Sequence, residues 1–266
     1  MYTKKFYQGQ ISGSVLSAKK VVPVLMKIFH PDSVLDVGCG LGGWLAEFEA
    51  AGCCVTGVDG GWVNSKSLLI NEKSFMSVDL EACAAAGKIP GLKEGQRFSI
   101  VTTFEVAEHL RPEVARQFVK LLTTYSNVVI FSAAIPYQGG TNHVNERWPD
   151  YWVDLFSEVG YELMDIVRPA IWEDKEVEPW YRQNMLAFIR RESMTHGLAS
   201  YTPGKIDKTL LRVVHPDFFL MSVELFESNT YLRSLGTRRL IAVLWEQAWS
   251  GLSRWLFQTR RTRSPL

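Results

Sequence analysis

A glycine-rich turn carries the most specific chemical signal in this chain. Gly38, Gly40 and Gly43 follow the apolar run 34–37 and come directly before a helical pattern. Glycine is needed where a backbone turns tightly and a ligand approaches closely, and a strand, a glycine turn and a helix in this order are typical of a nucleoside-type cofactor site. The carboxylate of Asp36 stands two positions before the first glycine, where it would repel a pyrophosphate but bind a cationic group. We therefore expect an adenosyl cofactor with a positively charged end rather than a dinucleotide.

Two further acids follow the next predicted strands. Asp59 ends the second strand about 20 residues beyond the turn, where a carboxylate can bind the two hydroxyls of a ribose. Asp79 follows the third strand, where its carboxylate can accept a hydrogen bond from an adenine amino group. Asp79 has a second interpretation, because aspartate is also a preferred cap for the N-terminus of a helix.

A polar loop at 136–149 contains residue types that can move a proton. It follows the fifth predicted strand, and ligands bind beyond the carboxyl ends of strands in open α/β sheets. His143 is a candidate general base or substrate anchor, because an imidazole titrates near neutral pH; alternatively, its hydrogen bonds only fix the loop. Glu146 would either orient His143 or cap the helix that begins near Pro149. His109 is a third candidate for proton transfer, although positioning alone can also catalyse without an essential base.

These residues need a scaffold, and strand and helix patterns alternate along the chain. The predicted strands are 34–37, 53–58, 75–78, 98–104, 128–133, 162–167 and 185–189. The predicted helices are 14–29, 41–50, 113–125 and 151–159, the first of them capped by Ser14 and ended by Pro31. This alternation predicts a parallel sheet with helices on both faces, and the apolar first, fourth and fifth strands suit its centre. The segment 169–184 is predicted to be irregular.

Composition argues against several classes of protein. The 266 residues carry a formal net charge of +1, and there is no basic stripe with interleaved aromatics before the C-terminal region, so we expect no nucleic-acid partner. The four cysteines form no CxxC pair, so we expect reduced thiols and no metal site. No signal peptide is evident near Lys4 and Lys5, and no apolar run reaches the roughly 20 residues of a membrane-spanning helix. A cytoplasmic location is therefore expected.

Two segments resemble motifs of class I S-adenosylmethionine-dependent methyltransferases. The run DVGCGLGGW at 36–44 is similar to the first motif of that family, and FEVAEHL at 104–110 is similar to a segment of many small-molecule methyltransferases. The resemblance implies an α/β fold, namely a Rossmann-like sheet of seven mostly parallel strands with helices on both faces and an antiparallel final hairpin. Beyond this sheet, the sequence pattern itself predicts a helical C-terminal extension. The resemblance also implies S-adenosylmethionine as cofactor and S-adenosylhomocysteine as product. Ser99 departs from the family pattern, in which aspartate is frequent, but it lies at the start of its strand, away from the functional end.

The expected cofactor contacts cover the glycine turn, the three acids and the end of the fourth strand. They are Asp36, Gly38, Cys39, Gly40, Gly42, Trp44, Asp59, Gly60, Asp79, Leu80, Phe104, Glu105 and Val106. In the resembling family the Phe-Glu-Val stretch lies beside the cofactor, and the following histidine faces the site or braces the next loop. The catalytic candidates are His143, Glu146 and His109.

A longer set of matches is spread over most of 6–220 and is most specific in HVNERWPDYW at 143–152. It looks like one bacterial group of stand-alone methyltransferases encoded among surface-glycan and secondary-metabolite genes. This resemblance implies methylation of a small biosynthetic metabolite or sugar, and it does not fix the acceptor atom. We expect methyl transfer by SN2 displacement to a hydroxyl, amine or carboxylate, with O-methylation favoured. N-methylation of a small amine is the alternative, and a nicotinamide-dependent oxidoreductase or a non-catalytic scaffold would be different classes.

Three regions are expected along the chain: a helical lid at 1–30, a methyltransferase domain at 31–192 and a helical extension at 193–266. The resemblance implies that the lid closes over the cofactor. The extension ends in a basic, tryptophan-rich amphipathic segment at 237–266. Such a segment packs on its own domain or on a second copy of the chain, or lies on an anionic membrane. The expected partners are therefore a small-molecule methyl acceptor and a homodimer partner or a membrane surface.

Overall fold

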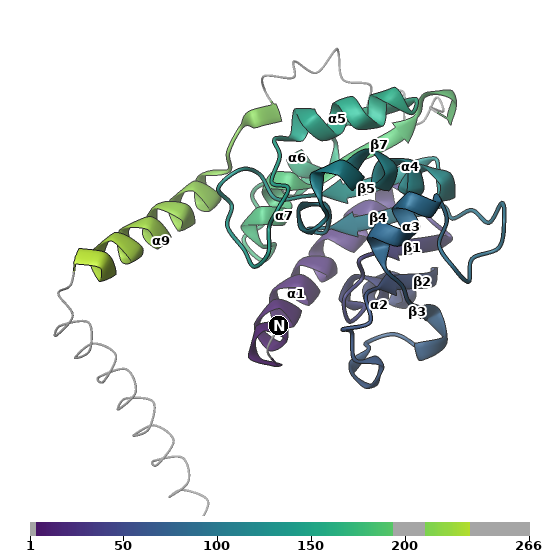
Figure 1. Ribbon diagram of the computed structural model, residues 1–266, viewed down its shortest axis with the longest axis horizontal. Helices are drawn as coiled ribbons and strands as arrows, with labels where there is room; N and C mark the ends of the chain where they lie inside the picture. The colour runs from purple at the N-terminus through teal and green to yellow at the C-terminus, as the bar shows by residue number, and fades with distance from the viewer. Residues whose placement is uncertain (1–3, 194–210, 235–266) are drawn as a thin grey trace, which may run out of the picture. The chain divides into compact units, whose positions relative to one another are not determined.

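The computed structural model describes residues 4–193 and 211–234 (Figure 1). The chain forms two compact units, Met1–Phe218 and Phe219–Leu266, and the first contains the whole sheet. The three expected regions stay predictions, and the amphipathic segment 237–266 lies outside the described residues. Among the helices that the structure describes, none is long and apolar enough to cross a membrane.

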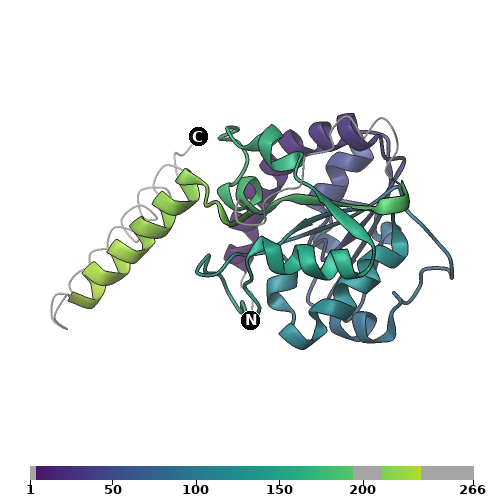
Figure 2. The same cartoon turned by 90° about the horizontal axis from the view of Figure 1, so that it is seen from above.

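A seven-stranded sheet forms the centre of the first unit (Figures 1 and 2). Its strands are β1 (Ser33–Val37), β2 (Cys54–Asp59), β3 (Phe75–Ser77), β4 (Ile100–Phe104), β5 (Val128–Ser132), β6 (Tyr161–Met164) and β7 (Leu186–Arg190). The order across the sheet is β3-β2-β1-β4-β5-β7-β6. The first five strands pair in parallel, whereas β7 runs antiparallel to both β5 and β6. The predicted α/β sheet of seven mostly parallel strands with a final antiparallel hairpin is thus confirmed.

Helices cover both faces of this sheet, as Figure 2 shows. The helices of the first unit are α1 (Lys4–Phe29), α2 (Gly43–Ala50), α3 (Leu80–Ala86), α4 (Ala115–Tyr125), α5 (Pro149–Glu158), α6 (Val167–Ile171) and α7 (Pro179–Asn184). The last described helix, α9 (Pro216–Ser234), begins at the end of this unit and continues into the second. Short 3-10 turns lie at Ser65–Ser67, Glu72–Ser74, Ala107–His109, Pro112–Val114 and Arg191–Ser193. Side chains alternate between the two faces of a strand, so Leu35 packs with α3, α4 and α5 while Val34 packs with α1, α2, α6 and α7. The strands at the centre are therefore buried on both sides, which explains their apolar sequences.

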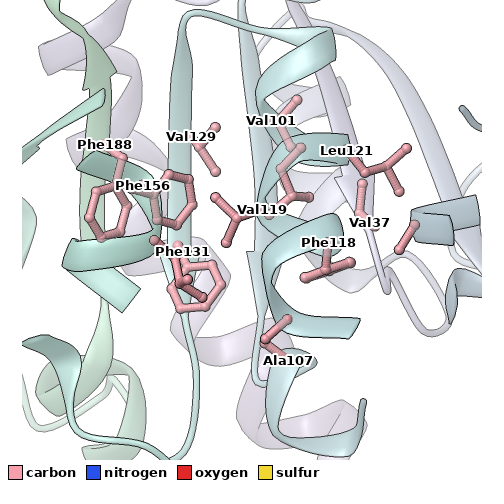
Figure 3. Packing of buried hydrophobic residues seen from close by; sticks show 14 of the residues in the cluster. Val37, Val101, Ala107, Phe118, Val119, Leu121, Val129, Phe131, Phe156 and Phe188 are labelled. Atoms are coloured by element: carbon pink, nitrogen blue, oxygen red, sulfur yellow. The ribbon is translucent and has the colours of Figure 1, made fainter. Parts of the chain in front are cut away.

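Aromatic packing fastens α5 to the sheet (Figure 3). The rings of Phe156 on α5 and Phe188 on β7 are stacked, with centroids 3.8 Å apart. Phe131 on β5 meets Phe156 edge-on at 5.6 Å, and Trp152 of α5 lies 5.0 Å from Phe131. Because α5 follows the polar loop 136–149, this packing anchors the C-terminal end of that loop.

The first helix is longer than the sequence pattern predicted. It begins at Lys4, so Ser14 lies inside the helix and the prediction that it caps the N-terminus is wrong. Gly9 and Gly13 weaken the helical pattern over the first turns, because glycine has a low helix propensity, and this explains the error. The second of these glycines has a packing reason, since a Cβ at Gly13 would stand 2.2 Å from the Oε1 atom of Glu178.

The C-terminal half of α1 belongs to the core. Val21 and Leu25 are fully buried in the cluster that includes α2 and α6. The Ser17 hydroxyl accepts a hydrogen bond from the backbone N–H of Glu178 at 3.0 Å. Any lid movement within residues 1–30 would therefore have to leave the C-terminal half of α1 in place. The lid itself stays a prediction.

The connection between β6 and β7 is more regular than predicted. The prediction of an irregular segment at 169–184 is wrong, because this segment contains most of α6 and all of α7. Both helices are too short to show a helical period, although Pro179 occupies the first turn of α7, where its missing N–H is tolerated. The predicted strand 162–167 ends earlier, where Asp165 pairs with Arg168 of α6. The helix α3, which the sequence indicated only through the possible capping role of Asp79, has an alanine-rich sequence, LEACAAA, without a clear amphipathic pattern.

Polar contacts tie residues 211–218 to α6 and α7. The Nη1 atom of the buried Arg182 donates a hydrogen bond to Asp217 Oδ2 at 2.9 Å. The Nε2 atom of His215 lies 2.8 Å from the carbonyl oxygen of Trp172, the residue that follows α6. The segment 213–218, which falls within the matched range 6–220, thus has a packing role in this unit.

Candidate active site

The sheet order brings the predicted site residues to one edge. β1 lies between β2 and β4, and β4 lies beside β5, so the carboxyl ends of these four parallel strands meet. Gly38 follows β1, Asp59 ends β2 and Glu105 follows β4. The loop 136–149 comes after β5. Ligands bind at this edge in open α/β sheets, where neighbouring connections leave in opposite directions.

The glycine turn after β1 is closely packed backbone. Gly38, Gly40 and Gly42 have φ angles of 87°, 55° and 80°, in the left-handed region that favours glycine. A Cβ at Gly38 would stand 2.3 Å from the side chain of Val106. The N–H of Gly38 donates to the carbonyl of Val58 at 2.8 Å, which holds the turn against β2. This cradle lets a ligand approach the backbone, as an adenosyl cofactor requires.

Asp36 is a buried acid beside this turn. It is 2% exposed, and its Oδ1 atom accepts a hydrogen bond from the Thr102 hydroxyl at 2.8 Å. Burial raises the pKa of Asp36 to about 7; the Thr102 hydrogen bond opposes this rise and the Asp59 carboxylate adds to it. A positive charge nearby would favour the ionised form. The residues present therefore fit a cofactor with a cationic end.

Asp59 joins the glycine turn to the end of β2. Its Oδ2 atom accepts a hydrogen bond from the N–H of Gly40 at 2.7 Å, and its Oδ1 atom accepts one from the N–H of Gly60 at 2.6 Å. The Trp62 side chain also hydrogen-bonds to this carboxylate, whose two oxygens offer about four acceptor positions, so one remains for a ribose hydroxyl. The exposed Trp62 lies over Gly60, where a Cβ would stand 2.1 Å from the indole ring. The sequence analysis did not select Trp62, although an aromatic residue just after the acid and two glycines was a visible signal.

Asp79 caps α3. Its Oδ1 atom accepts a hydrogen bond from the N–H of Ala82 at 3.0 Å, which is the second of the two roles that the sequence left open. Leu80, the first residue of α3, is buried in the core. Contacts of Asp79 and Leu80 with an adenine ring stay predictions.

Three aromatic rings, one each from α2, the end of β4 and α7, form a buried cluster. The ring centroid of Trp44 lies 4.4 Å from that of Phe104 and 5.0 Å from that of Tyr181. Tyr181 belongs to α7, in a segment predicted to be irregular, and was not among the expected cofactor contacts. Cys39 is also buried, and burial raises the pKa of its thiol well above the ordinary value, so this cysteine packs rather than reacts.

Glu105 links the end of β4 to α7 and to the loop after β5. Its φ of 54° is unusual for a residue other than glycine, and such strain is concentrated at functional sites. Its Oε1 atom accepts a hydrogen bond from Asn184 at 3.2 Å, and its Oε2 atom accepts one from Gln138 at 2.5 Å. Burial raises the pKa of Glu105 to about 7, while these hydrogen bonds oppose the rise. Gln138 lies in the polar loop 136–149 but was not selected as a site residue, and the sequence offered no signal for Asn184.

Glu146 organises the loop after β5. Its carboxylate accepts hydrogen bonds from the N–H groups of Tyr137 at 2.8 Å and Gly139 at 3.1 Å, and it lies 2.9 Å from Nδ1 of His143. This contact with Nδ1 fits the first predicted role of Glu146, the orientation of His143. The alternative role is wrong, because α5 begins at Pro149 without a side-chain cap.

His109, the third catalytic candidate, is brought to His143. The two rings lie edge to face, with centroids 4.8 Å apart. Burial and the neighbouring His143 lower the pKa of His109. Beside them is Glu108, a fully buried acid that the sequence analysis did not select. Burial and the Glu105 carboxylate raise the pKa of Glu108, and nearby backbone amides only partly offset this effect.

This fold, with a glycine cradle and acids at the ends of β1 and β2, defines a class I S-adenosylmethionine-dependent methyltransferase. The chain belongs to the methyltransferase domain family, whose profile matches residues 10–166. The predictions of fold, enzyme class and cofactor are thereby confirmed, and S-adenosylmethionine is the methyl donor. The roles of the individual site residues stay predictions.

Similar solved structures include other methyltransferases. A S-adenosylmethionine-dependent methyltransferase from Archaeoglobus fulgidus is 14% identical, with a TM-score of 0.51 over 71% of this chain and 99% of that one. Magnesium protoporphyrin IX methyltransferase from Synechocystis PCC 6803, with bound S-adenosylhomocysteine, is 20% identical, with a TM-score of 0.46 over 70% and 87% of the two chains. The plantazolicin methyltransferase BpumL, also with S-adenosylhomocysteine, is 13% identical, with a TM-score of 0.48 over 69% and 86%. At such identities the likeness concerns the fold alone. No curated protein sequence matches the chain.

Proposed function

We propose that this enzyme methylates a hydroxyl group of a small biosynthetic metabolite or sugar. The observation that carries the proposal is the pair of His143 and Glu146 at the ligand-binding edge of the sheet. Nδ1 of His143 lies 2.9 Å from the Glu146 carboxylate, so an N–H at this position leaves Nε2 as a proton acceptor. A hydroxyl needs such a base more than an amine does, because an amine attacks with its lone pair before it loses a proton.

Each group at this edge has a separate task in the proposed reaction. S-adenosylmethionine supplies a methyl carbon that the hydroxyl oxygen attacks by SN2 displacement, with S-adenosylhomocysteine as the leaving product. Asp36 and the glycine turn hold the cationic end of the donor, and Asp59 holds its ribose. Nε2 of His143 accepts the hydroxyl proton, and the Glu146 carboxylate stabilises the resulting imidazolium.

An acceptor screen tests the class of substrate. The purified full-length chain is incubated with deuterated-methyl S-adenosylmethionine and a panel of sugars, sugar nucleotides, amino sugars and hydroxylated metabolites. Mass spectrometry detects the labelled product, and NMR locates the methyl group. A methyl ether on a hydroxyl acceptor supports the proposal, whereas transfer to nitrogen alone would replace it with the N-methyltransferase alternative.

The first prediction concerns His143. His143→Asn should lower kcat by about a hundredfold or more, which is the usual scale for loss of a general base, while the Kd for S-adenosylmethionine stays the same. The matched control is His30→Asn, which makes the same change at an exposed histidine after α1. An unchanged kcat in His143→Asn would show that the residue only fixes the loop.

A further inference from the structure

We propose that Glu108, His109 and His143 bind a divalent metal ion, although no metal site was expected from the sequence. Each residue offers one ligand atom, and these atoms all lie within 4.8 Å of one another. The first two residues follow β4, and the third belongs to the loop after β5. Two imidazole nitrogens and one carboxylate oxygen are a donor set typical of Zn²⁺ and related first-row ions at sites that keep open coordination positions.

Glu108 provides an independent reason to place a cation here. Glu108 is completely buried, and within the described part of the chain neither of its carboxylate oxygens accepts a hydrogen bond of good geometry; only the backbone amides of Glu108 and Ala134 lie nearby. A buried acceptor without well-formed hydrogen bonds is costly, and more so when it is charged. The carboxylates of Glu105 and Glu146 add negative charge around it. A bound dication would give the Glu108 oxygens a partner and offset this repulsion.

His143 is already oriented as a metal ligand. Its Nδ1 faces the Glu146 carboxylate at 2.9 Å, so Nε2 is the nitrogen left to coordinate. A carboxylate behind a ligating histidine fixes the ring and raises the basicity of the coordinating nitrogen. Gly140 provides the space beside this ring, because a Cβ there would stand 2.3 Å from Nε2.

Side-chain rotation would close the site around an ion. Ligand atoms that share an ion at about 2.1 Å lie about 3–3.5 Å from one another. The present separations are within 4.8 Å, and the two imidazole rings already meet at an angle of 84°. Solvent reaches His109 and His143, so an ion has a route to the buried Glu108 carboxylate.

The ion would act on the methyl acceptor, and this part rests on the proposed O-methylation. Three protein ligands leave positions at which the acceptor hydroxyl oxygen can bind. Coordination to a dication lowers the pKa of a bound hydroxyl, whose proton then passes to solvent. His143 would in that form hold the ion, and the ion would replace the free imidazole in activating the hydroxyl.

Metal binding by itself tests the site without any acceptor. The full-length chain is freed of metal with a chelator and titrated with Co²⁺, followed by visible absorption and by calorimetry. One Co²⁺ per chain is expected, and Zn²⁺ should displace it. Glu108→Gln and His143→Asn should each weaken Co²⁺ binding at least tenfold, and Glu146→Gln should weaken it about 10–100-fold through the ring orientation. The control His30→Asn should bind Co²⁺ as the unchanged chain does.

Binding of S-adenosylmethionine serves as the folding control for each variant. If Glu108→Gln binds neither S-adenosylmethionine nor Co²⁺, the metal site is tested with His109→Asn instead. This variant alters a residue nearer the surface. The proposal is overturned if the unchanged chain forms no 1:1 Co²⁺ complex, or if folded Glu108→Gln or His109→Asn binds Co²⁺ normally. Failure of the proposed function would give a different result from failure of the metal site. Co²⁺ would bind as expected, but no hydroxyl acceptor would be methylated with Co²⁺ or with Zn²⁺.

Discussion

Gly38 and Gly40 show how single residues determine the cofactor turn. Both have left-handed φ angles, 87° and 55°. They differ in their surroundings, because a Cβ at Gly38 would stand 2.3 Å from Val106 whereas a Cβ at Gly40 would have no atom within 4 Å. The pair therefore separates backbone strain, which both positions share, from steric overlap, which only Gly38 would suffer.

We expect Gly38→Ala to lower the free energy of unfolding more than Gly40→Ala does. Left-handed strain costs each variant about 1–2 kcal/mol, and overlap adds about 1–3 kcal/mol at Gly38. Urea unfolding measures the difference, and calorimetry should show weaker binding of S-adenosylmethionine by Gly38→Ala. Adding Val106→Ala to Gly38→Ala should recover part of the stability. Equal losses at the two glycines would rule out the contact with Val106 as the cause.

Among the elements, α1 combines a core helix with the predicted lid. Its C-terminal half carries one face of fully buried residues, while Leu16 on the same helix is 52% exposed. An amphipathic helix gains its stability in a protein from the packing of its apolar face. The two faces of α1 should therefore respond very differently to the same substitution.

Leu25→Ala should destabilise the protein by about 2–5 kcal/mol, because it leaves a cavity in the cluster shared with α2 and α6. Leu16→Ala should change the stability by less than about 0.5 kcal/mol. Thermal and urea unfolding of both variants provide the comparison. A small effect of Leu25→Ala would mean that α1 is only loosely attached, as a lid would be along its whole length.

The strands of the sheet could be predicted because buried parallel strands have short apolar sequences between turn signals. The helices α6 and α7 could not, because five or six residues are too few to show a period. At the site, His143 and Glu146 are three positions apart, and their contact could be expected from the sequence. The contact between Glu105 and Asn184 joins residues 79 positions apart, and only the folded chain shows it. Glu108 was missed because its burial arises from tertiary packing, which the sequence does not show.

Over the whole molecule the formal net charge is only +1, but buried acids are concentrated at the ligand-binding edge of the sheet. Asp36 is the clearest case. The titratable groups that interact with it, Asp59, Cys39 and Tyr181, are all neutral or negative, and Thr102 of β4 supplies its hydrogen bond. The ligand-free protein therefore holds a carboxyl group whose ionised form is poorly stabilised, and a cationic ligand corrects this.

The pH dependence of stability and of cofactor affinity should follow from this acid. The pKa of Asp36 is about 7 in the folded chain, against an ordinary value of 3.8, so the folded state binds its proton more tightly. The free energy of unfolding without ligand should then fall, by roughly 2–4 kcal/mol from this group, as the pH rises from about 4 to about 7. Affinity for S-adenosylmethionine should change in the opposite direction, increasing about tenfold between pH 6 and pH 8 because the ionised carboxylate binds the cation. Calorimetry and thermal unfolding across this range, with Asp36→Asn as the variant that cannot titrate, separate the contribution of Asp36 from that of the other acids. If Asp36→Asn keeps the full pH dependence of both quantities, the cation is held by another group.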